Sequence, residues 1–164
     1  SAQNLFYPKA IVDYDAFENL VQKVKPHREQ RLVTVNEFIK ISEEPGVIIL
    51  DTRSKKMYDQ KHIKGALHLN FSDFTQENLA KIIPSAETTI LIYCNNNFEG
   101  DEVNFASKMA MPEIIKKDID SITLALNIPT YLNLYGYGYR NVYELSELVY
   151  PHDKRIEFEG SEVR

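Results

Sequence analysis

The chain contains a single cysteine, Cys94, and no tryptophan. One cysteine excludes an internal disulfide, so a packed core has to supply the stability of the fold. At 164 residues, the chain can bury roughly 70% of the surface that its unfolded form exposes, which is enough for such a core. No apolar run approaches the ~20 residues of a membrane-spanning helix. We therefore expect no membrane partner.

Basic residues are outnumbered, 19 Lys and Arg against 24 Asp and Glu, and the net charge is −5. Binding of nucleic acid needs a basic face, so we expect no nucleic-acid partner. The histidines His62 and His68 lack the spacing and the supporting ligands of a zinc site, and we predict no metal and no cofactor. The start at Ser1, without an apolar leader, fits a soluble cytoplasmic protein or an exported one whose signal peptide has been removed.

Cys94 stands directly between an apolar run, residues 90–93, and a polar run, residues 95–101. A short apolar run that ends in Asn and Gly predicts a buried parallel strand whose carboxyl end opens into a loop. Ligands of open α/β sheets bind at that end of the strands. Cys94 is therefore a candidate nucleophile. The alternative is a small buried hydrophobe that finishes the strand.

The remaining pattern predicts helices and strands that alternate. Thr34 and Glu37 form a capping-box pattern at the start of one helix, Pro26 is expected to end the helix before it, and Ser72 to cap a later one. The predicted helices are 15–24, 34–44, 54–60, 72–83 and one that begins near Pro129, and the predicted strands are 47–50, 89–93 and 141–145. Apolar strands separated by helices predict an α/β fold with a parallel sheet covered on both faces.

Three further segments, in this order, resemble the rhodanese-like family. A buried strand ends in Asp51-Thr52-Arg53, and Tyr58 and His62-Ile63-Lys64-Gly65-Ala66 follow it; an apolar strand then ends in Cys94, and Gly138-Tyr139-Arg140-Asn141-Val142-Tyr143 comes last. The resemblance covers about residues 33–145. It implies a central parallel sheet with helices on both faces.

On this basis the chain divides into an N-terminal helical extension (1–32), a rhodanese-like domain (33–150) and a C-terminal tail (151–164). The domain carries an insertion at about 98–127, which is either a lid or partner-binding element or a surface excursion without a role. The tail alternates at Ile156 and Phe158, so it is expected to add a short edge strand.

The resemblance implies a chemistry for Cys94: its thiolate takes a sulfane sulfur from a small donor or a protein persulfide, holds it as a persulfide and passes it to a thiol or another nucleophile. The amides of the following loop are expected to cradle the sulfur. The residues of this expected active-site loop are Asn95, Asn96, Asn97, Phe98, Glu99 and Gly100.

The loop departs from the family in its charge. Family loops often carry arginines, whereas the charged residues here are Glu99, Asp101 and Glu102. Carboxylates near the sulfur raise the pKa of a thiol and repel thiosulfate. We therefore expect poor transfer from thiosulfate, and a lower thiol pKa in Glu99→Arg. A phosphatase of the same fold needs an arginine six residues after the cysteine, where this chain has Gly100.

Asp51, Arg53 and His62 match family positions. We expect structural roles for them: Asp51 caps the following turn, Arg53 pairs with acids under the loop, and His62 bonds to the backbone. The alternative is that Arg53 steers anions toward Cys94. Five tyrosines between 131 and 143 are expected to lie mostly in the core, with some available to a recognition surface.

Two functions follow from these observations. The first is a sulfurtransferase or persulfide carrier that uses Cys94 and works poorly with thiosulfate. The second is a catalytically silent module that binds a protein partner through the loop and the insertion.

Overall fold

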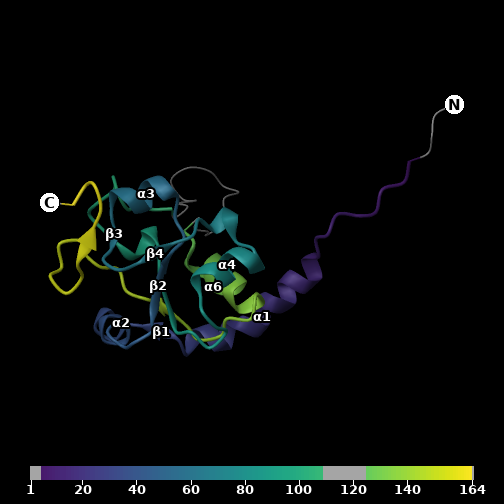
Figure 1. Cartoon of the computed structure of the whole chain (residues 1–164), viewed down its shortest axis with the longest axis horizontal. Helices are drawn as coiled ribbons and strands as arrows, with labels where there is room; N and C mark the ends of the chain where they lie inside the picture. The colour runs from purple at the N-terminus through teal and green to yellow at the C-terminus, as the bar shows by residue number, and fades with distance from the viewer. Residues whose placement is uncertain (1–4, 109–124, 164) are drawn as a thin grey trace, which may run out of the picture.

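The computed structural model describes residues 5–108 and 125–163, and its centre is a sheet of five parallel strands in the order β1–β6–β5–β2–β4 (Figure 1). These strands are β1 (Leu32–Val33), β2 (Ile48–Asp51), β4 (Leu67–His68), β5 (Ile90–Tyr93) and β6 (Val142–Leu145). The expected strands 47–50, 89–93 and 141–145 are thus neighbours in one parallel sheet, as predicted.

Helices cover both faces of the sheet (Figure 1). The described α-helices are α1 (Tyr14–Glu29), α2 (Val35–Ser42), α3 (Lys55–Gln60), α4 (Gln76–Ile82) and α6 (Asn127–Gly136). Successive residues of β5 point to opposite faces: Ile90 and Ile92 pack with α1, α4 and α6, while Leu91 packs with α2. This alternation follows from the pleat of a strand and explains why all four residues of β5 are apolar and buried.

The expected edge strand of the tail is present, although it pairs outside the main sheet. Strand β7 (Phe158–Glu159) lies antiparallel to β3 (His62–Ile63), and the two form a separate two-stranded sheet. The tail therefore closes over the chain segment that follows α3.

Two of the predicted helix boundaries are wrong. Pro26 lies inside α1, which continues to Glu29 because its last turn is held by tertiary contacts: Arg28 pairs with Glu144, and His27 bonds to Tyr131. These contacts offset the lost backbone hydrogen bond of proline.

Ser72 is the other wrong boundary. It lies in a short 3₁₀ turn, Phe71–Asp73, and the cap of α4 is Thr75, whose hydroxyl accepts from the amide of Asn78 at 3.0 Å. The capping box at Thr34 is confirmed, with both reciprocal hydrogen bonds formed.

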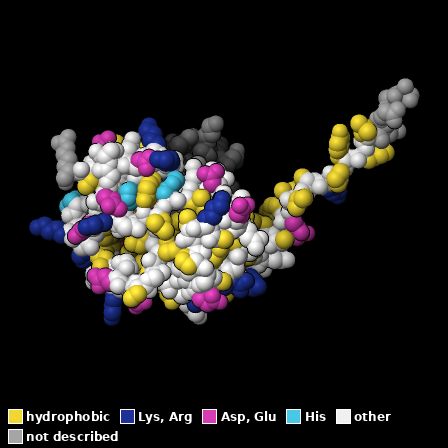
Figure 2. Space-filling model, viewed as in Figure 1, with side chains coloured by type: hydrophobic (Ala, Val, Ile, Leu, Met, Phe, Trp, Pro, Cys, Tyr) yellow, Lys and Arg dark blue, Asp and Glu magenta, His cyan; other side chains and the backbone are white. Residues whose placement is uncertain are grey.

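The segment before α1 extends away from the body, and Figure 2 shows hydrophobic side chains along it. The predicted apolar stripe of α1 is buried only at its C-terminal end, where Val24 is 1% exposed, whereas Phe17 is 54% exposed. Among the described residues, no helix is both long and apolar enough to cross a membrane.

Most of the expected insertion, residues 109–124, lies outside the described residues. Its described ends take two different courses. Phe98 leaves the end of β5 and forms a parallel bridge with Val149, while residues 125–127 return to Cys94 at the start of α6.

Candidate active site

Cys94 follows β5 directly, at the carboxyl edge of the sheet and between two neighbouring strands. Tyr93 is in register with Asp51 on β2, and Ile92 is in register with Glu144 on β6. Cys94 is 1% exposed. The thiol therefore occupies the position at which α/β sheets bind ligands, but it is covered by protein.

Two backbone amides donate to the sulfur of Cys94. The amide of Leu126 lies 3.2 Å from Sγ, and the amide of Asn95 also donates to it. Burial is the largest influence and raises the pKa of the Cys94 thiol above its ordinary value, although both amides lower it. Asp51 adds to the rise and Arg53 opposes it. The resting cysteine is therefore a neutral thiol with two donors already directed at its sulfur.

Of the loop amides expected to cradle Cys94, that of Asn95 donates to the sulfur, whereas those of Asn97, Phe98 and Glu99 donate elsewhere. Asn95–Asn97 make a 3₁₀ turn, in which the amide of Asn97 donates to the Cys94 carbonyl and that of Phe98 to the Asn95 carbonyl. The amide of Glu99 donates to Val149 at 3.0 Å. The chain turns away after Asn97, and the second amide comes from Leu126, 32 residues further along the chain.

Asn97 ties three segments of the site together. Its Oδ1 accepts from the Cys94 amide at 2.9 Å and from the Asn127 side chain at 2.8 Å. Its Nδ2 donates to the carbonyls of Leu145 and Glu147, at 2.9 and 3.1 Å. The side chain is buried, and these four hydrogen bonds join the ends of β5 and β6 to the start of α6. Asn97 therefore positions the loop.

The side chains of the other loop residues have different surroundings. Phe98 is buried in an aromatic cluster with Phe105, 4.5 Å between ring centroids, and Phe158, 5.3 Å. Glu99 and Gly100 are exposed. Asn96 accepts through Oδ1 from the amide of Lys108 at 2.9 Å.

The predicted cause of a raised thiol pKa needs correction. The direction is as expected, but burial comes first, and the carboxylate that contributes is Asp51. Asp101 Oδ2 lies 2.9 Å from Lys61 Nζ. Burial alone would raise the pKa of Asp101, but hydrogen bonds from Lys61 and Asn104 outweigh it and lower this pKa. Glu102 accepts from the amide of Ser107.

Asp51 and Arg53 form a buried pair beneath the loop. Arg53 Nη2 lies 2.8 Å from Asp51 Oδ2, and the two side chains are 2% and 0% exposed. Asp51 also accepts from the backbone amide of Arg53 at 3.0 Å and from the hydroxyl of Tyr93. Arg53 Nη1 donates to the Asn104 carbonyl at 3.0 Å. Asp51 thus accepts from the turn that follows it and Arg53 pairs with an acid under the loop, as the sequence predicts. The guanidinium of Arg53 is engaged in these contacts.

His62 is held by contacts on both ring nitrogens. Its Nδ1 lies 2.6 Å from the carbonyl of Tyr58, and its Nε2 lies 3.2 Å from Glu159 on β7. The ring stacks on Tyr58 with 3.8 Å between centroids. His62 therefore bonds to the backbone, as expected, and its contact with Glu159 joins it to the tail.

A cavity of about 290 Å³ opens at the same edge of the sheet, next to the 3₁₀ turn. It is bordered by an ion pair between Arg28 and Glu144, whose Nη2 and Oε2 atoms lie 2.5 Å apart. Its lining comes from α1, β1, β6, the 3₁₀ turn and the start of α6: Arg28, Leu32, Asn96, Asn97, Ala125, Asn127, Ile128, Pro129, Glu144, Leu145 and Ser146.

Sequence reasoning missed three of these contributors. Leu126 acts through its backbone amide, which no side-chain pattern reveals. Asn127 and Arg28 reach the site only through the fold. Pro129 was the one available signal, since it marks the start of the helix that brings Leu126 to the sulfur. Among the described residues, no three His, Cys, Asp or Glu side chains are grouped so that they could hold a metal ion.

Comparison with known proteins gives one family and one fold. A family model described as the rhodanese-like domain matches residues 34–147. The solution structure of a rhodanese-like domain from Anabaena sp. is 18% identical, covers 80% of each chain and has a TM-score of 0.51. A crystal structure of a Bacillus halodurans protein is 18% identical, covers 90% of this chain and 86% of its own, and has a TM-score of 0.49. No curated protein gives a significant match.

Proposed function

The chain belongs to the rhodanese-like domain family, and we propose that Cys94 accepts a sulfane sulfur and carries it as a persulfide. The observation that supports the proposal most is the pair of amides, from Leu126 and Asn95, that donate to Sγ at the carboxyl end of the central strand. Hydrogen bonds to the anionic form of a sulfur favour that form, and a persulfide is more acidic than a thiol.

The proposed step is an exchange between a thiolate and a persulfide. The Cys94 thiol first gives its proton to water, and the thiolate then attacks the outer sulfur of a donor R–S–SH. The new Sγ–S bond forms and the bond between the two donor sulfurs breaks. The donor leaves as RS⁻, which takes the proton of the transferred sulfur and becomes the thiol RSH. The product is a Cys94 persulfide anion, which an acceptor thiolate later attacks at the outer sulfur, regenerating the Cys94 thiolate.

The electrostatics of the site favour a neutral or protein-borne donor over thiosulfate. The positive charge of Arg53 favours the thiolate of Cys94, but the ion pair with Asp51 offsets this charge. Burial also keeps the thiol neutral at rest. A dianion such as thiosulfate therefore gains little attraction at this sulfur.

The test is a transfer assay with two donors. The protein is incubated with a small organic persulfide and an acceptor thiol, and separately with thiosulfate and cyanide. We expect turnover with the persulfide, turnover at least tenfold slower or absent with thiosulfate, and none with either donor in Cys94→Ser. Equal rates in wild type and Cys94→Ser would remove the proposal.

A silent rhodanese-like module is the second candidate, and the 1% exposure of Cys94 favours it. Its discriminating measurement is the rate at which a small neutral alkylating reagent modifies Cys94 in the folded protein. Modification on the time scale of the transfer assay fits the carrier. Modification only after unfolding, together with no transfer, fits the silent module.

A further inference from the structure

The opposite edge of the sheet from Cys94 also has a pocket, of about 350 Å³. It lies at the amino ends of three adjacent strands, β1, β6 and β5, where the loops that lead into them meet. Because the sheet is parallel, this edge is separated from Cys94 by the full length of the strands. The residues that line the pocket are Arg31, Ala86, Glu87, Gly138, Arg140 and Asn141.

Two guanidinium groups in this lining are held by aromatic rings. Arg140 Cζ lies 3.9 Å from the ring centroid of Tyr135, and Arg31 Cζ lies 5.7 Å from that of Tyr143. Within residues 5–108 and 125–163, neither arginine forms a salt bridge, in contrast to Arg28, Arg53 and Arg155. The Nε atom of Arg31 is buried without a hydrogen-bond partner there. Within the same residues, the guanidinium groups of Arg31 and Arg140 therefore have donors available for a ligand.

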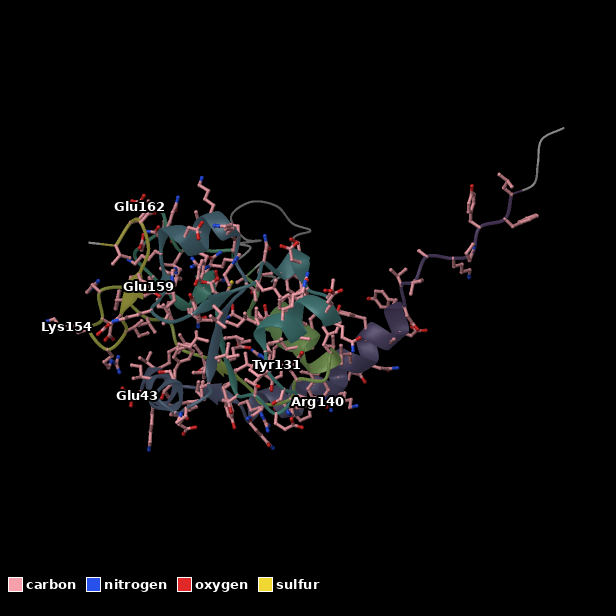
Figure 3. The ribbon with its side chains drawn as sticks, viewed as in Figure 1. Glu43, Tyr131, Arg140, Lys154, Glu159 and Glu162 are labelled. Carbon is pink, nitrogen blue, oxygen red and sulfur yellow. The ribbon has the colours of Figure 1, made fainter. Side chains whose placement is uncertain are left out.

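Two further basic side chains, His27 and Lys23, lie near the two arginines. Burial lowers the pKa of His27, and the charges of Arg31 and Arg140 lower it further, so both lie close enough to act on that ring. Lys23 Nζ is 5.8 Å from the centroid of the Tyr135 ring that also holds Arg140. Figure 3 labels Arg140 and Tyr131, which locate this region in the molecule.

The carboxylates of this region leave the two arginines without a partner. Glu144 is bound by Arg28 through two hydrogen bonds, one of 2.8 Å and one of 2.5 Å. Glu87 belongs to the pocket lining, but no salt bridge joins it to either arginine in the described residues. A ligand with two or more negative charges would supply the acceptors that these carboxylates do not.

We propose that this pocket binds a phosphate group, either as free phosphate or as the phosphomonoester of a small molecule. Guanidinium groups donate in a planar fork that fits phosphate oxygens, and stacking on tyrosine rings reduces the entropy lost when they bind. This site is separate from Cys94, and the proposal is independent of sulfur transfer.

Isothermal titration at low salt tests the proposal with inorganic phosphate and, in a second arm, glycerol 3-phosphate. We expect Arg140→Gln to weaken binding by roughly tenfold or more, the loss of one charge-assisted interaction. Because Arg140 is exposed, this variant is expected to fold. Glu87→Gln is expected to tighten binding, since it removes the one acid of the lining.

Lys154→Gln is the matched control, because it removes one positive charge far from the pocket (Figure 3). Similar binding in both arms supports a free-phosphate site, and binding of glycerol 3-phosphate alone supports a phosphomonoester site. The proposal is overturned if neither compound binds the wild-type protein, or if Arg140→Gln and Lys154→Gln have the same effect.

Discussion

Asn97 is the side chain on which the geometry around Cys94 depends most. It makes four hydrogen bonds, two of them buried and two partly buried. We predict that Asn97→Ala lowers the free energy of unfolding by about 2–4 kcal/mol, because it leaves buried backbone groups without partners. Asn97→Asp keeps the acceptor but cannot donate to the two carbonyls, so it should also destabilise. Urea unfolding measures both, and a loss below about 0.5 kcal/mol in Asn97→Ala would contradict this role.

The pKa of Cys94 is the second prediction at this scale. Burial raises it, so alkylation by a small neutral reagent should show an apparent pKa above the ordinary value of about 8.5. Glu99 is exposed, and its amide bonds to Val149 rather than to the sulfur. Glu99→Gln should therefore leave the alkylation profile unchanged. A lower apparent pKa in this variant would restore the acidic-loop explanation that the sequence suggested.

The position of Cys94 at the end of a buried strand was predictable, because it depends on a local apolar run followed by Asn. The partners of its sulfur were not. The Leu126 donor is a backbone amide, and it reaches Sγ only because α6 begins beside β5. The acidic residues wrongly suggested that loop carboxylates raise the thiol pKa, and the reason is similar. The charge of a segment does not show that Phe98 packs into the aromatic cluster and so directs the following residue, Glu99, away from the sulfur.

At the scale of elements, α1 is attached to the sheet through its C-terminal half. Val24 and Val21 lie one helical turn apart but are 1% and 39% exposed. We predict that Val24→Ala destabilises the protein by about 2 kcal/mol, the cost of removing two buried methyl groups and leaving a gap. Val21→Ala is the matched control and should change stability by less than about 0.5 kcal/mol. Equal losses would mean that the whole helix is docked.

Helix boundaries show which elements a sequence specifies. The capping box of α2 depends on Thr34 and Glu37 alone, and it was predicted correctly. The end of α1 depends on Glu144 and Tyr131, more than 100 residues away in the sequence, and it was predicted wrongly at Pro26. Local hydrogen bonds are visible in a short segment, whereas tertiary contacts that extend a helix past a proline are not.

For the whole molecule, the shifted groups predict how stability changes with pH. Burial raises the pKa of Cys94 and of Tyr93 in the folded state. The unfolded chain therefore loses these protons first, at about pH 8.5 for the thiol and about pH 10 for tyrosine. Stability is fully present below those values and falls as the pH rises through them. Urea unfolding from pH 7 to 11 measures this fall in the free energy of unfolding, and Cys94→Ser should delay its onset toward pH 10. A free energy of unfolding that stays constant from pH 7 to 11 would contradict the prediction.

The acid side has the opposite sign. Hydrogen bonds from Lys61 and Asn104 lower the pKa of Asp101 despite its partial burial, and a hydrogen bond from the Gly65 amide is the largest cause that lowers the pKa of Glu159. Their contribution is present above the unfolded value of about 4 and is lost as the pH falls through the lower folded values. The protein should therefore be most stable between about pH 5 and 8.

The central claim is that Cys94 carries sulfur, and the intact mass of the protein tests it most directly. The folded protein is treated with a small organic persulfide, separated from the donor and weighed by mass spectrometry without reduction. We predict a gain of one sulfur atom in the wild-type protein, its removal by an acceptor thiol, and no gain in Cys94→Ser. An unchanged mass in the wild-type protein, with the same donor charging a known sulfur carrier in parallel, would contradict the account.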